Sequence, residues 1–148
     1  MIAIGSDHRG YKLKEEIKRY FEEKEIEFKD FGTDSEERMD YPKIASEVSK
    51  SIQKKECDLG ILICGTGFGM TIVANKYKGI RCADCYSEET AKFAKGHSNV
   101  NILSLPADFV NTSKAISIIR MWLGTEFMGG RYQDRIKMIE EIEKENMK

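Results

Sequence analysis

The sequence lacks any apolar run long enough to cross a membrane, and its charges almost cancel. Its 24 Lys and Arg side chains face 25 Asp and Glu side chains, which leaves a net charge of −1. No overall field would therefore draw the protein to nucleic acid or to a membrane surface. Residues 1–5 lead straight into strand-like sequence without a basic or apolar leader. We therefore expect a cytoplasmic protein with no nucleic-acid or membrane partner.

Metal ligands and paired cysteines are also scarce. The chain has two histidines and four cysteines, namely His8, His97, Cys57, Cys64, Cys82 and Cys85. Cys82 and Cys85 form a single CxxC inside a predicted strand, where residues three apart point to opposite faces. Without a second pair, this spacing disfavours a closed zinc site. We expect four reduced thiols, no metal and no cofactor.

The 148 residues fit one domain, along which two hydrophobic periodicities alternate. Short apolar runs predict strands at 2–6, 26–31, 59–63, 79–85 and 100–105. Segments with apolar residues at helical spacing separate them. This order favours an α/β fold, a Rossmann-like three-layer α/β/α sandwich around a five-stranded parallel sheet. An extra C-terminal helix follows Gly129-Gly130 with a narrow apolar stripe, and we expect segment 129–148 to pack on a neighbouring subunit.

The most informative stretch is the apolar run that ends at Cys64. It breaks into the alternating glycines of Gly65-Thr66-Gly67-Phe68-Gly69 before a helical segment centred on 70–76. Cys64 therefore lies at a strand-to-helix turn, at the edge of the sheet where α/β proteins bind ligands. Backbone N–H groups and the helix dipole at such a turn should lower the pKa of the thiol. Cys64 is thus a candidate nucleophile or base.

Three other groups of residues can be placed relative to Cys64. Asp7 and His8 leave the first strand, which neighbours the third in a doubly wound sheet, so the two loops can share a pocket. His97 follows a helix and lies at the opposite end of the sheet, so a second subunit must supply it to the same site. Arg131 and Arg135 share one helical face and can clamp a phosphate. Together these groups indicate proton transfer on a phosphorylated small molecule.

The glycine turn does not match either of two common phosphate-binding motifs. The turn lacks the lysine of GxxxxGK[ST], and it reads GxGxG rather than GxGxxG. Asp84 lies at about the spacing of a ribose-binding acid, which keeps NAD as a weak alternative. Each residue taken singly also fits a structural role, such as a turn cap for Asp7.

Ordered motifs run along nearly the whole chain: Gly5-Ser6-Asp7-His8, Asp30-Phe31-Gly32-Thr33, Asp40-Tyr41-Pro42, Cys64-Gly65-Thr66-Gly67, Ala74-Asn75-Lys76, Gly79-Ile80-Arg81, His97 and Gly129-Gly130-Arg131. They resemble the B-type ribose-5-phosphate isomerase family, which includes galactose-6-phosphate and allose-6-phosphate isomerases. The resemblance implies one sugar-phosphate isomerase domain over 1–148. It also implies that the chain interconverts ribose 5-phosphate and ribulose 5-phosphate, a step of the pentose phosphate pathway.

The resemblance also implies a role for each site residue. Cys64 is the base that moves a proton between C1 and C2 through an enediolate, His97 serves in opening the sugar ring, and Thr66 is a further catalytic residue. The residues that hold the substrate are Asp7, His8, Gly65, Gly67, Phe68, Gly69, Ser98 and, at its phosphate, Arg131 and Arg135. The family works as homodimers or homotetramers with sites between subunits, which agrees with the position of His97.

This chain departs from the family pattern at two site positions. Ser98 stands where the family usually has Asn, and Asp108 stands where it commonly has a phosphate-binding arginine. We hypothesise that Arg9, at a position that is usually small, partly replaces the missing charge. Arg9, Tyr41 and Asp108 are therefore further candidate site residues. The alternative functions are an isomerase of allose 6-phosphate or galactose 6-phosphate, and a non-catalytic flavodoxin-like nucleotide-binding module.

Overall fold

Strands and helices alternate five times along the chain, as the sequence predicts. The computed structural model describes residues 1–147. The elements are β1 (Ile2–Ser6), α1 (Tyr11–Glu23), β2 (Phe28–Asp30), α2 (Tyr41–Gln53), β3 (Leu59–Cys64), α3 (Phe68–Ala74), β4 (Cys82–Asp84), α4 (Glu88–Gly96), β5 (Ile102–Pro106), α5 (Thr112–Gly124) and α6 (Arg131–Asn146). The strands form one parallel sheet in the order β2-β1-β3-β5-β4. This confirms the predicted α/β fold.

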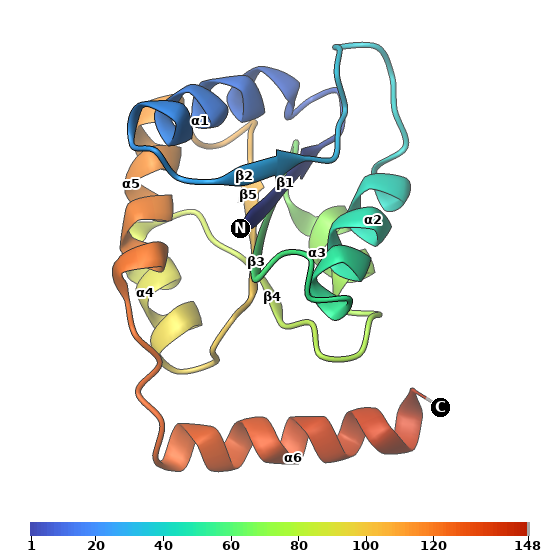
Figure 1. Cartoon of the computed structure of the whole chain (residues 1–148), viewed down its shortest axis with the longest axis vertical. Coiled ribbons are helices and arrows are strands. Elements are labelled where there is room, and N and C mark those ends of the chain that lie inside the picture. Colours follow the sequence, from blue (N-terminus) through green and yellow to red (C-terminus); the bar gives the residue numbers. More distant parts are fainter. Residues whose placement is uncertain (148) are drawn as a thin grey trace.

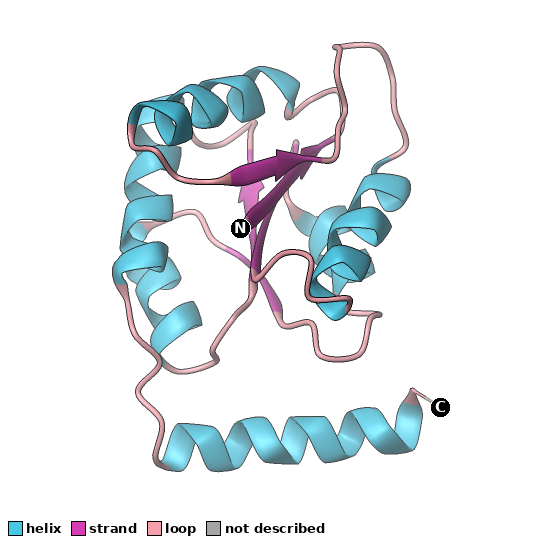
Figure 2. Ribbon diagram, in the orientation of Figure 1, coloured by secondary structure: helices cyan, strands magenta, loops and turns pink. Residues whose placement is uncertain are grey.

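Helices cover both faces of the sheet, so two hydrophobic cores flank it. Helices α1, α4 and α5 pack on one face and α2 and α3 on the other (Figure 1). Figure 2 shows the strands between these two helical layers. The three central strands are almost continuously buried, which explains their unbroken apolar sequences. Helix α6 lies outside both layers, across the end of the sheet where the strands begin (Figure 1).

Side-chain caps mark the start of two helices, α4 and α5. Ser87 and Thr90 form a reciprocal cap at the start of α4, and the Asn111 side chain accepts the N–H of Lys114 at 2.8 Å at the start of α5. The two edge strands, β2 and β4, are shorter than their apolar runs suggest, with three residues each. An edge strand has a neighbour on one side only, so fewer of its residues are held in the ladder.

The predicted separation of the CxxC cysteines is also confirmed. Cys82 packs in the core under α2 and α3, whereas Cys85 packs in the core under α1, α4 and α5. All four cysteines are buried free thiols. Within residues 1–147 no three His, Cys, Asp or Glu side chains gather as a metal site would require, and no helix is long and apolar enough to cross a membrane.

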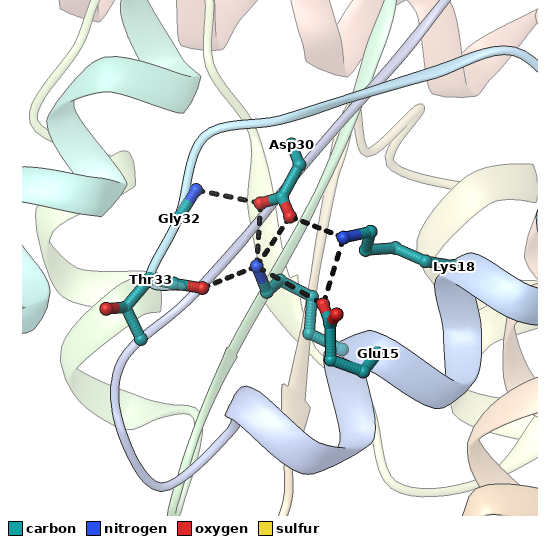
Figure 3. Close-up of polar contacts among 6 residues, drawn as sticks. Glu15, Lys18, Asp30, Gly32 and Thr33 are labelled. Atoms are coloured by element: carbon teal, nitrogen blue, oxygen red, sulfur yellow. Dashed lines mark hydrogen bonds and ion pairs between the residues drawn. The ribbon is translucent and has the colours of Figure 1, made fainter. Parts of the chain in front are cut away.

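A fully buried lysine ties the loop after β2 to α1. The Lys14 ammonium donates to both carboxylate oxygens of Asp30 at 2.7 Å and to the carbonyl of Thr33 at 2.6 Å. Asp30 also accepts from Lys18 at 2.9 Å and from the N–H of Gly32 at 2.8 Å (Figure 3). Burial alone would raise the pKa of Asp30, but these hydrogen bonds outweigh it and leave the pKa below its ordinary value.

This network keeps the loop after β2 next to the carboxyl end of β1. The N–H of Ser6, the last residue of β1, donates to the carbonyl of Gly32 at 2.6 Å, and the N–H of Thr33 donates back to Ser6 at 2.7 Å. Pairing with β1 thus continues past the end of β2 at Asp30. The loop stays next to Asp7, the residue that follows β1.

Asp30→Asn should lower the free energy of unfolding by about 3 kcal/mol at pH 7, because the buried Lys14 ammonium loses its nearest carboxylate and keeps only the more distant one of Glu15, at 3.7 Å. The pKa of Asp30 is lower in the folded chain than in the unfolded chain. Its contribution is therefore complete above the unfolded value of about 3.9 and is lost as the pH falls through the folded value. The difference between wild type and variant should narrow below about pH 4.

Denaturant unfolding at pH 7 and pH 3 measures this difference. Asp58→Asn is the matched control, because its side chain is 82% exposed and pairs only with the N-terminus; it should change stability by less than about 0.5 kcal/mol. An Asp30→Asn variant as stable as the wild type at pH 7 would contradict the prediction.

Candidate active site

The two central strands place an acid beside the predicted thiol. Ser6 pairs with Ile63 across β1 and β3, so Asp7 and Cys64 leave the same edge of the sheet side by side. The predicted neighbourhood of the first and third strands is thus confirmed. The Asp7 carboxylate also accepts the N–H groups of Arg9 and Gly10, both at 3.0 Å, and so organises its own turn.

The glycine turn directs a backbone N–H at the sulfur of Cys64. The N–H of Gly67 donates to Sγ at 3.2 Å. Gly67 has a φ of +80°, and a Cβ there would lie 2.0 Å from a carboxylate oxygen of Asp84, so no other residue fits. The Ser104 hydroxyl donates to the Gly67 carbonyl at 2.9 Å, and the Thr66 hydroxyl accepts the N–H of Phe68 at 3.2 Å. The turn is therefore held rigidly around the thiol.

The prediction that this turn lowers the pKa of Cys64 is wrong for the single chain. Burial raises the pKa of the thiol, and Asp7 raises it further. The N–H groups of Met70, Gly67 and Thr66 act in the opposite direction but do not outweigh these effects. Cys64 is 6% exposed, so lost hydration of the thiolate dominates over a few backbone dipoles from a seven-residue helix.

Four more predicted residues surround the turn. His8 accepts the N–H of Met39 on Nδ1 at 3.1 Å, which assigns the ring proton to Nε2. The Tyr41 ring packs on Gly69, where a Cβ would come within 2.4 Å of it. The Arg9 guanidinium pairs with Asp108, and both groups lie against Gly65. The structure therefore brings Arg9, Tyr41 and Asp108 against the Cys64 turn, and His8 contacts the loop that leads to Tyr41.

The remaining predicted residues lie at the opposite end of the sheet. His97 caps the C-terminus of α4, and its ring stacks on Tyr132 of α6 with centroids 4.2 Å apart and planes 9° apart. The guanidinium carbons of Arg131 and Arg135 lie 5.0 and 5.9 Å from the Tyr132 ring centroid. Ser98 is exposed next to His97. The expectation that one chain cannot bring His97 to Cys64 is confirmed (Figure 1).

A cavity of about 310 Å³ opens beside the glycine turn, lined by Thr66, Phe68, Asp84, Tyr86, Pro106 and Phe109. Its rim is apolar, because Phe68, Tyr86 and Phe109 are each more than 60% exposed. Burial raises the pKa of Asp84 to about 6. Tyr86, Phe109 and Tyr132 are not among the site residues predicted from the sequence. The sequence did carry a signal for each of them. Tyr86 and Phe109 follow the ends of β4 and β5, and Tyr132 lies between the two arginines.

A model of the family described as Ribose/Galactose Isomerase matches residues 2–139. The chain belongs to this family. Ribose-5-phosphate isomerase B of Escherichia coli (strain K12) is 43% identical over 142 residues, which span 96% of this chain and 95% of that protein. The membership predicted from the ordered motifs is thus confirmed, and the chain is an isomerase.

Solved structures of the family share the whole architecture. Ribose-5-phosphate isomerase B of Clostridium thermocellum superposes with a TM-score of 0.96 at 44% identity, covering 97% of both chains. The Mycoplasma genitalium enzyme with bound ribulose-5-phosphate gives a TM-score of 0.93 at 42% identity, covering 98% of this chain and 97% of that one. The extra helix α6 is therefore part of a fold shared over nearly the full chain.

Asp7→Asn should make Cys64 react several-fold faster with iodoacetamide at pH 7.5. The asparagine removes a charge that raises the pKa of the thiol but keeps an oxygen to accept the N–H groups of Arg9 and Gly10. Only the thiolate is alkylated, so a lower pKa raises the rate. Mass spectrometry of the Cys64 peptide follows the reaction. Asp58→Asn, remote from the turn, should leave the rate unchanged, and an equal rate in Asp7→Asn and wild type would refute the electrostatic coupling.

Proposed function

We propose that this chain interconverts ribose 5-phosphate and ribulose 5-phosphate in the cytoplasm, with Cys64 as the base. The observation that carries the proposal is the Cys64 sulfur at the carboxyl end of a central strand, with the Gly67 N–H directed at it. The names of full-length relatives support the substrate. The Mycoplasma genitalium relative holds ribulose-5-phosphate.

The reaction moves a proton between two neighbouring carbons of the open-chain sugar. The Cys64 thiolate takes the C2 proton of ribose 5-phosphate, and the electrons of that bond flow into the C1 carbonyl to form an enediolate. Return of the proton to C1, together with transfer of the O2 hydroxyl proton to O1, gives ribulose 5-phosphate, with C1 reduced and C2 oxidised. The intermediate carries an oxyanion, which backbone N–H groups of the Gly65–Gly69 turn and the Thr66 hydroxyl would stabilise.

The second half of the site would come from another copy of the chain. His97 would assist ring opening, Ser98 would contact the sugar, and Arg131 and Arg135 would hold the phosphate. These groups lie at the end of the sheet opposite Cys64, so a homodimer or homotetramer must bring the two ends together. The partner's two guanidinium groups would also lower the pKa of the Cys64 thiol, which burial and, to a lesser extent, Asp7 raise in the single chain.

Helix α6 supplies an apolar surface for that association. Met138, Ile139 and Ile142 are 62%, 43% and 57% exposed in the single chain. Exposed side chains of this kind gathered on one element mark an interaction surface. We propose that segment 129–148 packs on the neighbouring subunit and carries the arginines into its site.

The groups around Cys64 would bind the sugar itself. Asp7 and His8 have polar atoms at the carboxyl end of β1, and Tyr41 and Phe68 shape the wall of the turn. The Arg9–Asp108 pair is neutral as a unit, and the guanidinium keeps N–H groups that do not face Asp108. We propose that these donors contact the phosphate or a sugar oxygen. Arg9 would thereby partly replace the phosphate-binding arginine that is missing at position 108.

The wild-type protein should isomerise ribose 5-phosphate faster than allose 6-phosphate or galactose 6-phosphate in a parallel assay. Cys64→Ala should lower kcat by about 10²- to 10⁴-fold while substrate still binds, because only the base is lost. Cys57→Ala is the control, since Cys57 is also buried but precedes β3, at the end of that strand opposite Cys64. A Cys64→Ala variant with wild-type kcat would overturn the assignment of the base, and preference for a six-carbon sugar would overturn the substrate.

A mixture of two inactive variants tests whether the site is shared. Cys64→Ala and His97→Ala should each be inactive alone. After mixing and subunit exchange in equal amounts, roughly a quarter of wild-type activity should return, because half of the dimers are mixed and one of their two sites is intact. No recovery, although mass spectrometry shows mixed dimers, would mean that both residues act within one chain.

A further inference from the structure

We propose that Tyr132 is a positioning residue that joins His97 to the two arginines of α6 in one rigid unit. The inference rests on the proposed function, in which His97, Arg131 and Arg135 act together on the sugar phosphate of a second copy. It assigns a task to a side chain that does not itself hold the substrate.

The His97 ring is held between two aromatic side chains. Phe93, one turn earlier on α4, lies with its ring centroid 4.9 Å from the imidazole at an angle of 44°. Tyr132 stacks on it almost in parallel, 4.2 Å away and at 9°. Phe93 belongs to the same helix end as His97, so only the Tyr132 ring fixes the imidazole relative to α6. Such a stack adds an attraction between the two rings beyond the area that they bury.

The same tyrosine also organises the arginines. The Arg131 guanidinium donates to the Tyr132 hydroxyl at 3.0 Å, and its carbon lies 5.0 Å from the ring centroid. Arg135, one helical turn further on, lies 5.9 Å from the same centroid. Both distances are within the range of a cation–π contact. One ring thus contacts the imidazole and both cations.

The Tyr132 contacts matter because two glycines, Gly129 and Gly130, lie between α5 and α6. Gly129 and Gly130 both have positive φ, 66° and 55°, and neither has a neighbouring atom within contact distance of an added Cβ. Just before them, the N–H of Met128 donates to the Gly96 carbonyl at 3.0 Å. A glycine pair alone leaves the direction of the following helix poorly determined. The Tyr132 stack therefore fixes the start of α6 against the end of α4.

Proton NMR tests the stack without any assay of activity. The chain has two histidines, so a His8→Gln background leaves only the His97 imidazole signals. Tyr132→Leu in this background should move them downfield, because the ring current of the stacked tyrosine is lost. Tyr132→Phe should keep them in place, and Tyr20→Leu on α1 should not move them.

Kinetics on otherwise wild-type chains tests the consequence. Tyr132→Leu should lower kcat about tenfold for ribose 5-phosphate, since a misplaced imidazole and phosphate clamp miss the reacting geometry. Tyr132→Phe keeps the stack but loses the hydroxyl that accepts from Arg131. It should keep kcat within about twofold and raise KM about two- to threefold.

Each outcome decides the proposal. Imidazole signals that do not move in Tyr132→Leu would show that the stack is absent in solution. Signals that move while kcat and KM stay at wild-type values would show that the stack positions nothing for catalysis. A kcat in Tyr132→Phe as low as in Tyr132→Leu would transfer the role from the ring to the hydroxyl and overturn the proposal. A wild-type protein without turnover would instead overturn the proposed function, while the NMR result on the stack would still stand.

Discussion

One geometric constraint shapes the whole site: in a parallel sheet, a strand and the helix that follows it end at opposite edges. Cys64 ends β3, and His97 caps the end of α4. Catalysis by both residues therefore requires two copies of the fold, whatever the details of packing. A site shared between two copies would join groups that a single copy of the fold keeps apart. The exposed apolar face of α6 then follows as the surface that such an assembly would cover.

The electrostatics of the two ends complement each other. Around Cys64 the chain places Asp7, Asp84 and Asp108, and the thiol is buried and held mainly in its neutral form. Around His97 it places two exposed guanidinium groups on one aromatic ring. Neither end is suited to its task alone, because the Arg9 cation next to the Cys64 turn is paired with Asp108, and the two arginines of α6 lie far from the thiol. Association would supply the missing charge and exclude water in the same step.

The fold could be predicted from the sequence because its signals are local. The alternation of apolar runs, the Ser87 and Asn111 caps and the glycine turn after Cys64 each depend on a few neighbouring residues. The thiol pKa could not be predicted in this way, since its direction depends on the balance between burial and N–H donors in three dimensions. The buried pair of Lys14 and Asp30 was missed for the same reason. Its members read as ordinary charged residues until the fold shows that Lys14 has no exposed surface.

The Arg9–Asp108 pair affects which half of the site would bind the substrate phosphate. Because Asp108 neutralises Arg9, the Cys64 end offers the substrate phosphate little net positive charge. The greater part of phosphate binding would then fall to Arg131 and Arg135, which are exposed on α6 and anchored by a single ring. In such a chain the precision of the contact between α4 and α6 matters more than it would if each half held a phosphate cation of its own. Loss of the Tyr132 stack would then weaken phosphate binding and ring opening together, because the same ring contacts the His97 imidazole and both guanidinium groups.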